Sequence, residues 1–268
     1  MRHQIQQSSF QSLIRIAGQG LLAAPFALLI IVNYRLAQPG QQSKDQRILP
    51  VMKSKQQGRN LSDSEISEAR ELLDRLGYWV HLDVAGNDVS LRHALIAFQK
   101  IEGRRLTGVL TLEELEYLRV AEIPPVLETG YPHIEIDLHR QVLFVVDFAG
   151  VPLRILPISS GSGEFFTEGG VTRRAITPTG RFKVYRKIEG WRKSPLGLLY
   201  YPNYIYGGIA IHGNPSVPVH PASHGCIRIP MFASREFSEI ATIGTAVIVY
   251  GSDPLAETDA AGPGVLSI

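Results

Sequence analysis

The sequence is poor in cysteine and in blocks of charge. Cys226 is the only cysteine among 268 residues, which excludes an intramolecular disulfide bond and leaves a free thiol. The 27 Lys and Arg nearly balance the 25 Asp and Glu, for a formal charge of +2. No basic run stands out as a nucleic-acid footprint, so we expect no nucleic-acid partner.

Carboxylates are also missing around the cysteine. No Asp or Glu lies between Gly190 and Arg235, so a carboxylate that orients a catalytic group there would have to come from elsewhere in the fold.

The chain is 44% hydrophobic and 19% charged. Such a composition supports one or two ordinary folded domains rather than a disordered protein.

The segment from Gly207 to Pro230 holds Cys226 and three of the eight histidines. A thiol becomes a strong nucleophile only as the thiolate, so it needs a nearby base or positive charge to lower its pKa from about 8.5. Ile209 and Ile211 alternate up to His212, which predicts a short strand that delivers the imidazole to its end. Three prolines in the following loop fix its course back toward Cys226.

Two other interpretations of Cys226 remain open. A lone cysteine is by default a small buried hydrophobe. Zinc is the second alternative, because His212, His220, His224 and Cys226 include the ligand types of a tetrahedral site. Zinc would require three histidines to converge on the thiolate, whereas a general base needs fewer coincidences. We therefore expect no metal and no other cofactor.

Motifs around Cys226 resemble those of a known family. Two motifs flank the loop, HG at 212–213 and SHGCIR at 223–228. Two more lie upstream, GSG at 161–163 and TPTGRF at 177–182. Together they are similar to the signature of the bacterial L,D-transpeptidases, cysteine enzymes that remodel peptidoglycan. The resemblance covers about residues 131–251, under half of the chain.

This resemblance implies a mechanism. Cys226 would attack the carbonyl between the third residue and the fourth, D-alanine, of a peptidoglycan stem, and D-alanine would leave. An amine of a second stem would then attack the thioester to give a 3-3 cross-link. His212 would accept the thiol proton and return it to the leaving amine, oriented by the backbone carbonyl of Gly213. The backbone amides of Gly225 and Cys226 would stabilise the oxyanion.

Three further residues are expected to bind substrate: Arg228, Ser223 and His224. Arg228 suits a stem-peptide carboxylate, since a guanidinium can bind one bidentately. The alternative for Arg228 is a salt bridge that braces the loop. His224 either polarises the substrate or holds the loop. The glycine-rich stretch 161–170 is expected to be a passive surface loop, with a cover over the groove as the alternative.

Residues 131–251 are expected to form the catalytic domain. Short apolar segments predict strands, and one helical pattern spans 231–241. The turns are too short for parallel crossovers, so we predict an antiparallel β-sandwich with one short helix. The strands are expected near 134–138, 142–148, 153–158, 182–185, 208–211 and 245–250.

A small three-helix domain is expected at 61–121. Ser62 and Glu65 form a capping-box pattern, and apolar residues then recur at helical spacing. The segment resembles the peptidoglycan-binding domain often joined to wall enzymes. At 107–110, however, TGVL stands where that family commonly has Asp-Gly and another glycine. The alternative is that the shared positions are simply helical core.

The N-terminal residues 1–35 are expected to be an export signal or membrane anchor. Arg2 and Arg15 precede an uncharged run at 16–32, which is at the lower end of what spans a bilayer. We expect an uncleaved anchor in the cytoplasmic membrane, with cleavage as the alternative. A flexible linker is expected at 36–60 and a disordered tail at 252–268.

The sequence therefore predicts a monomeric, extracytoplasmic L,D-transpeptidase of the bacterial cell envelope. Its partners would be stem peptides, glycan and, through the N-terminal segment, the membrane. An L,D-carboxypeptidase or a protein-to-peptidoglycan ligase would use the same nucleophile with another acceptor. A non-catalytic wall-binding scaffold is the alternative of a different class.

Overall fold

A computed structural model describes residues 60–251 of the chain. The expected export segment at 16–32, the linker up to residue 59 and the tail at 252–268 lie outside the described residues. Across 60–251, no helix combines the length and the apolar character needed to cross a membrane.

Three helices come first, and we call residues 61–121 the helical module. They are α1 (Asp63–Arg75), α2 (Val89–Ile101) and α3 (Leu112–Val120). Each begins after a residue whose side-chain oxygen accepts a backbone N–H, as the free donors of a helix N-terminus require. Ser62 and Glu65 form the predicted capping box. The caps of α2 and α3 are Asp88 and Thr111.

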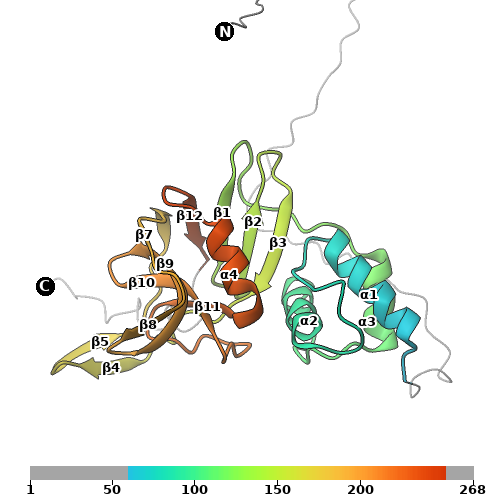
Figure 1. Ribbon diagram of the computed structural model, residues 1–268, viewed down its shortest axis with the longest axis horizontal. Coiled ribbons are helices and arrows are strands. Elements are labelled where there is room, and N and C mark those ends of the chain that lie inside the picture. The colour runs from blue at the N-terminus through green and yellow to red at the C-terminus, as the bar shows by residue number, and fades with distance from the viewer. Residues whose placement is uncertain (1–59, 252–268) are drawn as a thin grey trace, which may run out of the picture. The chain divides into compact units, whose positions relative to one another are not determined.

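Two five-stranded sheets form most of the remaining chain (Figure 1). The first sheet has the order β3-β2-β1-β12-β6, and the second has β11-β10-β9-β7 with β8 also paired to β9. The first sheet comprises β1 (His133–Asp137), β2 (Val142–Val146), β3 (Pro152–Pro157), β6 (Gly180–Lys183) and β12 (Ala246–Tyr250). The second comprises β7 (Arg186–Lys187), β8 (Trp191–Ser194), β9 (Gly197–Tyr206), β10 (Ile209–Asn214) and β11 (Ile227–Pro230). A separate hairpin joins β4 (Phe165–Glu168) to β5 (Val171–Arg174), and α4 spans Met231–Ile240.

The prediction of a mainly β catalytic domain is confirmed, but the prediction of purely antiparallel pairing is wrong. Strand β1 pairs parallel with β12, and β10 pairs parallel with β11. Strands β1 and β12 lie far apart in the chain, so no short turn joins them. Residues 215–226 between β10 and β11 provide the dozen residues that a parallel connection needs.

Strand β9 was not predicted because Pro202 lies within it. A proline inside an apolar run normally argues against a strand. Here the register between β9 and β10 shifts by one residue between Ile211 and Gly213. The extra residue falls beside Tyr201, whose φ is +46°. A β-bulge thus absorbs the proline, which is one of the few places where a sheet tolerates it.

Strand β2 is buried on both faces. Its sequence VLFVV shows no alternation, and all five residues are buried. Leu143 and Val145 face the core between the two sheets, where they join residues of α4 such as Phe237. Val142, Phe144 and Val146 instead share a core with the helical module. An uninterrupted apolar run is typical of a strand covered on both sides.

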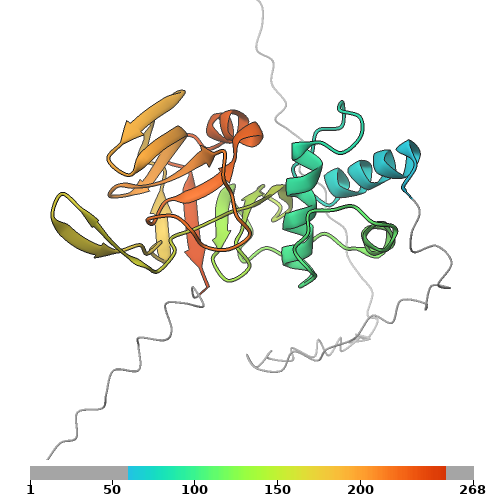
Figure 2. The same ribbon diagram turned by 90° about the horizontal axis from the view of Figure 1, so that it is seen from below.

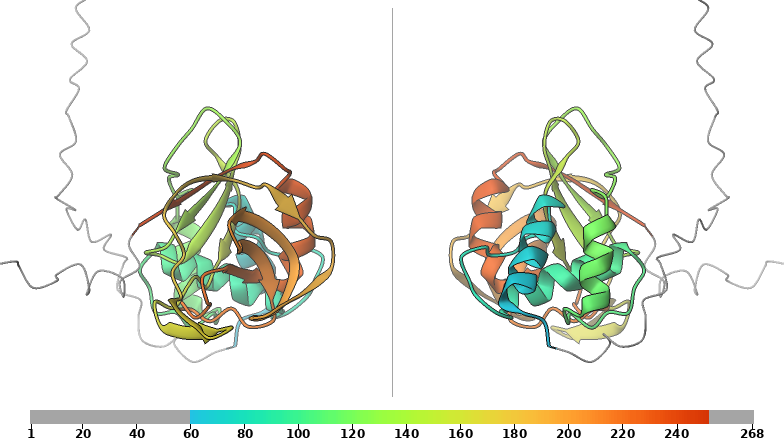
Figure 3. Two further views of the ribbon diagram at one scale, coloured as in Figure 1. Left: turned by 90° about the vertical axis from the view of Figure 1, so that its left-hand side faces the viewer. Right: turned by 90° about the vertical axis from the view of Figure 1, so that its right-hand side faces the viewer.

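The helical module therefore does not have a self-contained core of its own. Tyr78 and Phe98 meet edge to face with 5.7 Å between ring centroids, within the same cluster as Phe144 and Ile155 of the first sheet. Helix α2 lies beside β3, as Figures 1 and 2 show, and the three helices gather on this side of the sheet (Figure 3, right). The helices complete the packing of the sheet.

The turn after α1 attaches the module to β3. Gly77 has a φ of +90°, and its carbonyl accepts a hydrogen bond from Ile155 N at 2.7 Å. A Cβ atom at this position would lie 2.4 Å from the backbone oxygen of Pro152. Glycine is thus required both for the left-handed conformation and for the close approach of β3.

We predict that Gly77→Ala destabilises the protein more than Gly86→Ala does. Gly86 also has a positive φ, +69°, but a Cβ atom added there would meet nothing within 4 Å. Gly86→Ala should cost about 1 kcal/mol for the left-handed backbone, and Gly77→Ala about 2 kcal/mol more for the clash with Pro152. Urea unfolding of the full chain measures both values. Equal losses would show that the turn moves away from β3 without cost.

Candidate active site

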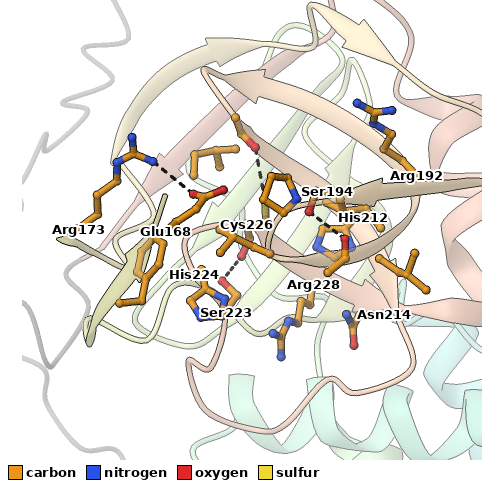
Figure 4. A pocket seen from close by; sticks show the side chains of 18 of the residues that line it. Glu168, Arg173, Arg192, Ser194, His212, Asn214, Ser223, His224, Cys226 and Arg228 are labelled. Atoms are coloured by element: carbon orange, nitrogen blue, oxygen red, sulfur yellow. Dashed lines mark hydrogen bonds and ion pairs between the residues drawn. The ribbon is translucent and has the colours of Figure 1, made fainter. Parts of the chain in front are cut away.

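The parallel pairing of β10 with β11 brings the sequence-predicted residues together. His212 lies opposite Arg228, and Ile211 lies opposite Ile227. Because side chains alternate along a strand, Arg228 and His212 project from the same face, and Cys226, two residues before Arg228, joins them. All three line one pocket (Figure 4). Ile211 and Ile227 point the other way and are fully buried in the core.

Two hairpins complete the pocket, which has a volume of about 530 Å³. One is β4–β5, which contributes Phe166, Glu168, Arg173 and Arg174. The other is β8–β9, which contributes Arg192 and the turn from Ser194 to Leu199. The stretch expected to be a passive loop at 161–170 contains β4 and the turn of the β4–β5 hairpin (Figure 2). Side chains of this hairpin line the pocket.

His212 is buried, with 4% of its surface exposed. Its Nδ1 lies 2.9 Å from the carbonyl oxygen of Gly213. A carbonyl can only accept a hydrogen bond, so we assign the proton to Nδ1, which leaves the lone pair on Nε2. Burial lowers the pKa of His212 to about 4; the bond to Gly213 opposes this shift, and the charge of Arg228 adds to it. The ring is therefore neutral at pH 7.

Cys226 is partly exposed, and its sulfur donates a hydrogen bond to the Gly208 carbonyl at 3.7 Å. Burial of the sulfur raises the pKa of the thiol, while the backbone amide of Ala210 and the charge of Arg228 oppose that shift. At rest Cys226 is thus a thiol rather than a thiolate. Its hydrogen bond is directed to the backbone of β9–β10, not to the imidazole.

Ser223 and Gly225 shape the loop that precedes Cys226. The Ser223 hydroxyl accepts a hydrogen bond from Gly225 N at 3.0 Å and donates one to the carbonyl oxygen of Cys226. Gly225 has a φ of +125°, and a Cβ there would lie 2.8 Å from a methyl group of Ile209. Ser223 thus holds the loop and also lines the pocket, so its expected contact with substrate stays a prediction. The Gly225 amide, expected at the oxyanion, is engaged by Ser223.

Thr177 connects the upstream TPTGRF motif to this loop. Its Oγ1 accepts a hydrogen bond from Gly161 N at 2.9 Å and donates one to the Gly225 carbonyl at 2.8 Å. Only 6% of Thr177 is exposed, so both bonds are shielded from water. One hydroxyl therefore fixes the GSG segment and the SHGC loop relative to each other. The motif indicates the family resemblance from the sequence, but a role for Thr177 becomes visible only in the structure.

Arg228 is half-buried and lines the pocket. Within residues 60–251, no carboxylate forms an ion pair with it, so the salt bridge considered from the sequence is absent there. Its backbone exchanges two hydrogen bonds with Ser159, at 3.0 and 3.1 Å. The guanidinium is thus held in the pocket without a counter-ion from this part of the chain.

His224 is exposed and packs edge-on against Phe166 of β4, with 4.8 Å between ring centroids. This contact links the SHGC loop to the β4–β5 hairpin. The hairpin itself carried a sequence signal, because Gly169 and Gly170 form a two-residue turn between β-prone segments.

In the described range, His, Cys, Asp and Glu side chains form no group of three or more that could hold a metal ion.

Comparison with known proteins gives a consistent result. The family model of the L,D-transpeptidase catalytic domain, YkuD, matches residues 131–249. A crystal structure of an L,D-transpeptidase from Xylanimonas cellulosilytica is 34% identical with a TM-score of 0.66, and the alignment covers 76% of this chain and 100% of that one. A structure of an L,D-transpeptidase from Stackebrandtia nassauensis is 20% identical with a TM-score of 0.44. The alignment covers 74% of this chain and 97% of that one.

No curated protein matches the chain. The Xylanimonas structure, which comprises residues 123–326 of that protein, is nevertheless covered completely at 34% identity, and the family model spans the two sheets and the pocket. The chain therefore belongs to the L,D-transpeptidase family.

Proposed function

We propose that the protein is a cell-wall transpeptidase in which Cys226 forms a thioester with a peptidoglycan tetrapeptide stem. The observation that carries the proposal is that a partly exposed thiol and a neutral imidazole line the same pocket. The imidazole is fixed by Gly213 so that Nε2 is the basic atom. These are the groups that acyl transfer through a cysteine requires.

In the first step, the sulfur of Cys226 attacks the carbonyl carbon that precedes D-alanine. Neither group is charged at rest, so the thiol proton passes to Nε2 of His212 as the C–S bond forms. The thiol has to turn from the Gly208 carbonyl toward the ring, a rearrangement expected on substrate binding. The oxyanion is stabilised by the Cys226 amide; the Gly225 amide can add to it only by releasing Ser223.

The remaining steps return every proton. The imidazolium gives its proton to the nitrogen of D-alanine, the C–N bond breaks, and the thioester remains. An amine of a second stem then attacks, His212 takes up its proton, and the sulfur leaves and is reprotonated. One amide bond is broken and one is formed, which gives the 3-3 cross-link. With water or a protein lysine as acceptor, the same groups would give a carboxypeptidase or a ligase.

The charge of the pocket supports an acidic peptide as substrate. Within residues 60–251, Arg192 and Arg228 line it without an ion pair to a carboxylate, whereas Arg173 pairs with Glu168. Arg228 lies beside Cys226 and is the residue that we propose for a stem-peptide carboxylate, because its guanidinium can bind one bidentately. Ser223 and His224 line the same pocket and are the further residues that we propose for contact with the substrate.

We further propose that the enzyme acts outside the cytoplasmic membrane, as a monomer anchored through residues 16–32, and that the helical module binds glycan. The sequence resemblance supports the last point. The module also carries a shallow pocket of about 320 Å³, lined by Ser67, Arg70, Glu71 and 82–85. A wall-binding scaffold without enzymatic activity, the alternative function, would bind glycan through this surface alone.

Replacing the nucleophile tests the enzymatic proposal. Cys226→Ala should lower the release of D-alanine from tetrapeptide muropeptides by more than about 10³-fold, because no other group can form the thioester. Mass spectrometry of the muropeptides follows the release and also identifies the acceptor. Ser216→Ala, in the same loop but exposed, is the control and should remain active. Undiminished activity in Cys226→Ala would exclude the proposed mechanism.

We predict that His212 stays neutral, with its proton on Nδ1, from pH 8 down to pH 5. Its folded pKa of about 4 lies below the value of about 6.5 in the unfolded chain. Its contribution to stability is therefore present above pH 6.5 and is lost as the pH falls toward 4. Imidazole ¹⁵N chemical shifts report the charge and the tautomer. An imidazolium at pH 6 would contradict the proposed resting state.

Glycan binding by the module is tested on its exposed surface. Leu82→Asp, in the module pocket, should weaken co-sedimentation with purified sacculi at least several-fold, because a carboxylate would replace apolar contact area. Val89→Asp is a matched control, since the two side chains are 54% and 55% exposed and Val89 lies outside the pocket. Parental binding by Leu82→Asp would remove this pocket as the glycan site.

A further inference from the structure

Lys100, in the last turn of α2, is buried with 7% of its surface exposed. Its Nζ donates hydrogen bonds to the carbonyl oxygens of Gln141 at 2.9 Å and Ile158 at 3.0 Å. Both acceptors belong to the catalytic domain. Burial lowers the pKa of Lys100 to about 7, and within residues 60–251 no carboxylate forms an ion pair with it. A buried amine of this kind is unfavourable unless its contacts compensate.

A short buried segment, residues 158–161, follows β3 and begins with Ile158, one of the two acceptors. The other acceptor, the Gln141 carbonyl, lies beside this segment. Ile158 N donates to the same Gln141 carbonyl at 2.9 Å, so that oxygen accepts two hydrogen bonds. The Gln141 side chain then accepts from Ser160 N at 2.9 Å and donates to Ser160 Oγ at 2.7 Å. Lys100 and Gln141 together hold this side of the segment.

The other side of the segment holds the catalytic loop. The Ser160 carbonyl accepts hydrogen bonds from Ala222 N at 2.9 Å and Ser223 N at 2.8 Å. Ser159 exchanges two backbone hydrogen bonds with Arg228. Ser223 in turn holds the carbonyl of Cys226. The residues on both sides of the nucleophile are therefore attached to the segment that Lys100 fixes.

We propose that Lys100 is a positioning residue for acylation. By binding the Gln141 and Ile158 carbonyls, it lets the helical module fix the position of the loop that holds Cys226. This inference rests on the proposed function in taking Cys226 as the nucleophile. An apolar residue at position 100 would fill the space but leave the Ile158 carbonyl without its donor from α2. The segment would then relax, and the loop would follow it.

A purely structural role for Lys100 makes a different prediction. If the lysine only attaches the helical module to the sheet, its loss lowers the melting temperature but leaves the chemistry of the folded protein unchanged. If it positions the loop, the folded protein also reacts more slowly. The rate constant of a single acylation, measured where all variants are folded, separates the two roles.

The experiment compares full-length Lys100→Met and Gln141→Met with the parent. Lys183→Met, an exposed lysine on β6, is the control. The probe is a carbapenem, whose ring opening on Cys226 is followed by absorbance and mass spectrometry. Amide hydrogen exchange of residues 222–228 is measured in parallel. We expect Lys100→Met to be acylated about 10- to 100-fold more slowly, with faster exchange in the loop, and Lys183→Met to match the parent.

Each outcome decides the proposal. Parental acylation and parental exchange in folded Lys100→Met would overturn it. If Lys100→Met does not fold, Lys100→Gln, which is shorter and uncharged, is judged by the same criteria, because Gln141→Met removes only the side-chain bonds to Ser160 and Leu138 and leaves those of Lys100 in place. If the parent itself is not acylated, the proposed function fails, and loop exchange alone tests the positioning: faster exchange in Lys100→Met supports it, and unchanged exchange overturns it.

Discussion

The parallel pairing of β10 with β11 is the contact on which the site depends. Because the strands run in the same direction and in the register His212 opposite Arg228, the base, the guanidinium and the thiol project from one face of the second sheet. Ile211, Ile227 and Ile229 fill the opposite face and are fully buried, so the register is fixed by the core. A slip of β11 by one residue would turn Cys226 and Arg228 into the core and Ile227 and Ile229 into the pocket.

Burial determines the proton state of this site. It lowers the pKa of His212 and raises that of Cys226, so both changes oppose an ion pair between thiolate and imidazolium. Many cysteine nucleophiles are activated in advance by a lowered pKa. In the proposed reaction the thiol would be activated only as it attacks, and at rest it stays protonated and less readily oxidised. Arg228 favours the thiolate and disfavours the imidazolium, so its charge would assist the proposed attack rather than an ion pair at rest.

The sequence predicts what depends on local pattern. The capping box at Ser62, the mainly β fold and the chemistry gathered around Cys226 all follow from residues close together in the chain. Strand β9 was missed because a bulge accommodates Pro202, which only the facing strand can reveal. The uninterrupted run of β2 indicates burial on both faces, yet it does not say which element covers each face. Lys100 has the pattern of an ordinary polar residue of a helix, because its two acceptors lie 41 and 58 residues away.

The two-sided burial of β2 also changes how the helical module is understood. A detachable wall-binding domain would contact the catalytic domain over a small polar interface. Here Phe98 and Tyr78 share a core with Phe144, so removal of the helices would expose the outer face of the first sheet and would also take Lys100 away from the Gln141 and Ile158 carbonyls. Loss of activity on deleting the module would therefore not demonstrate glycan binding. Substitutions on the exposed surface of the module are needed to separate wall binding from its part in the packing of the catalytic domain.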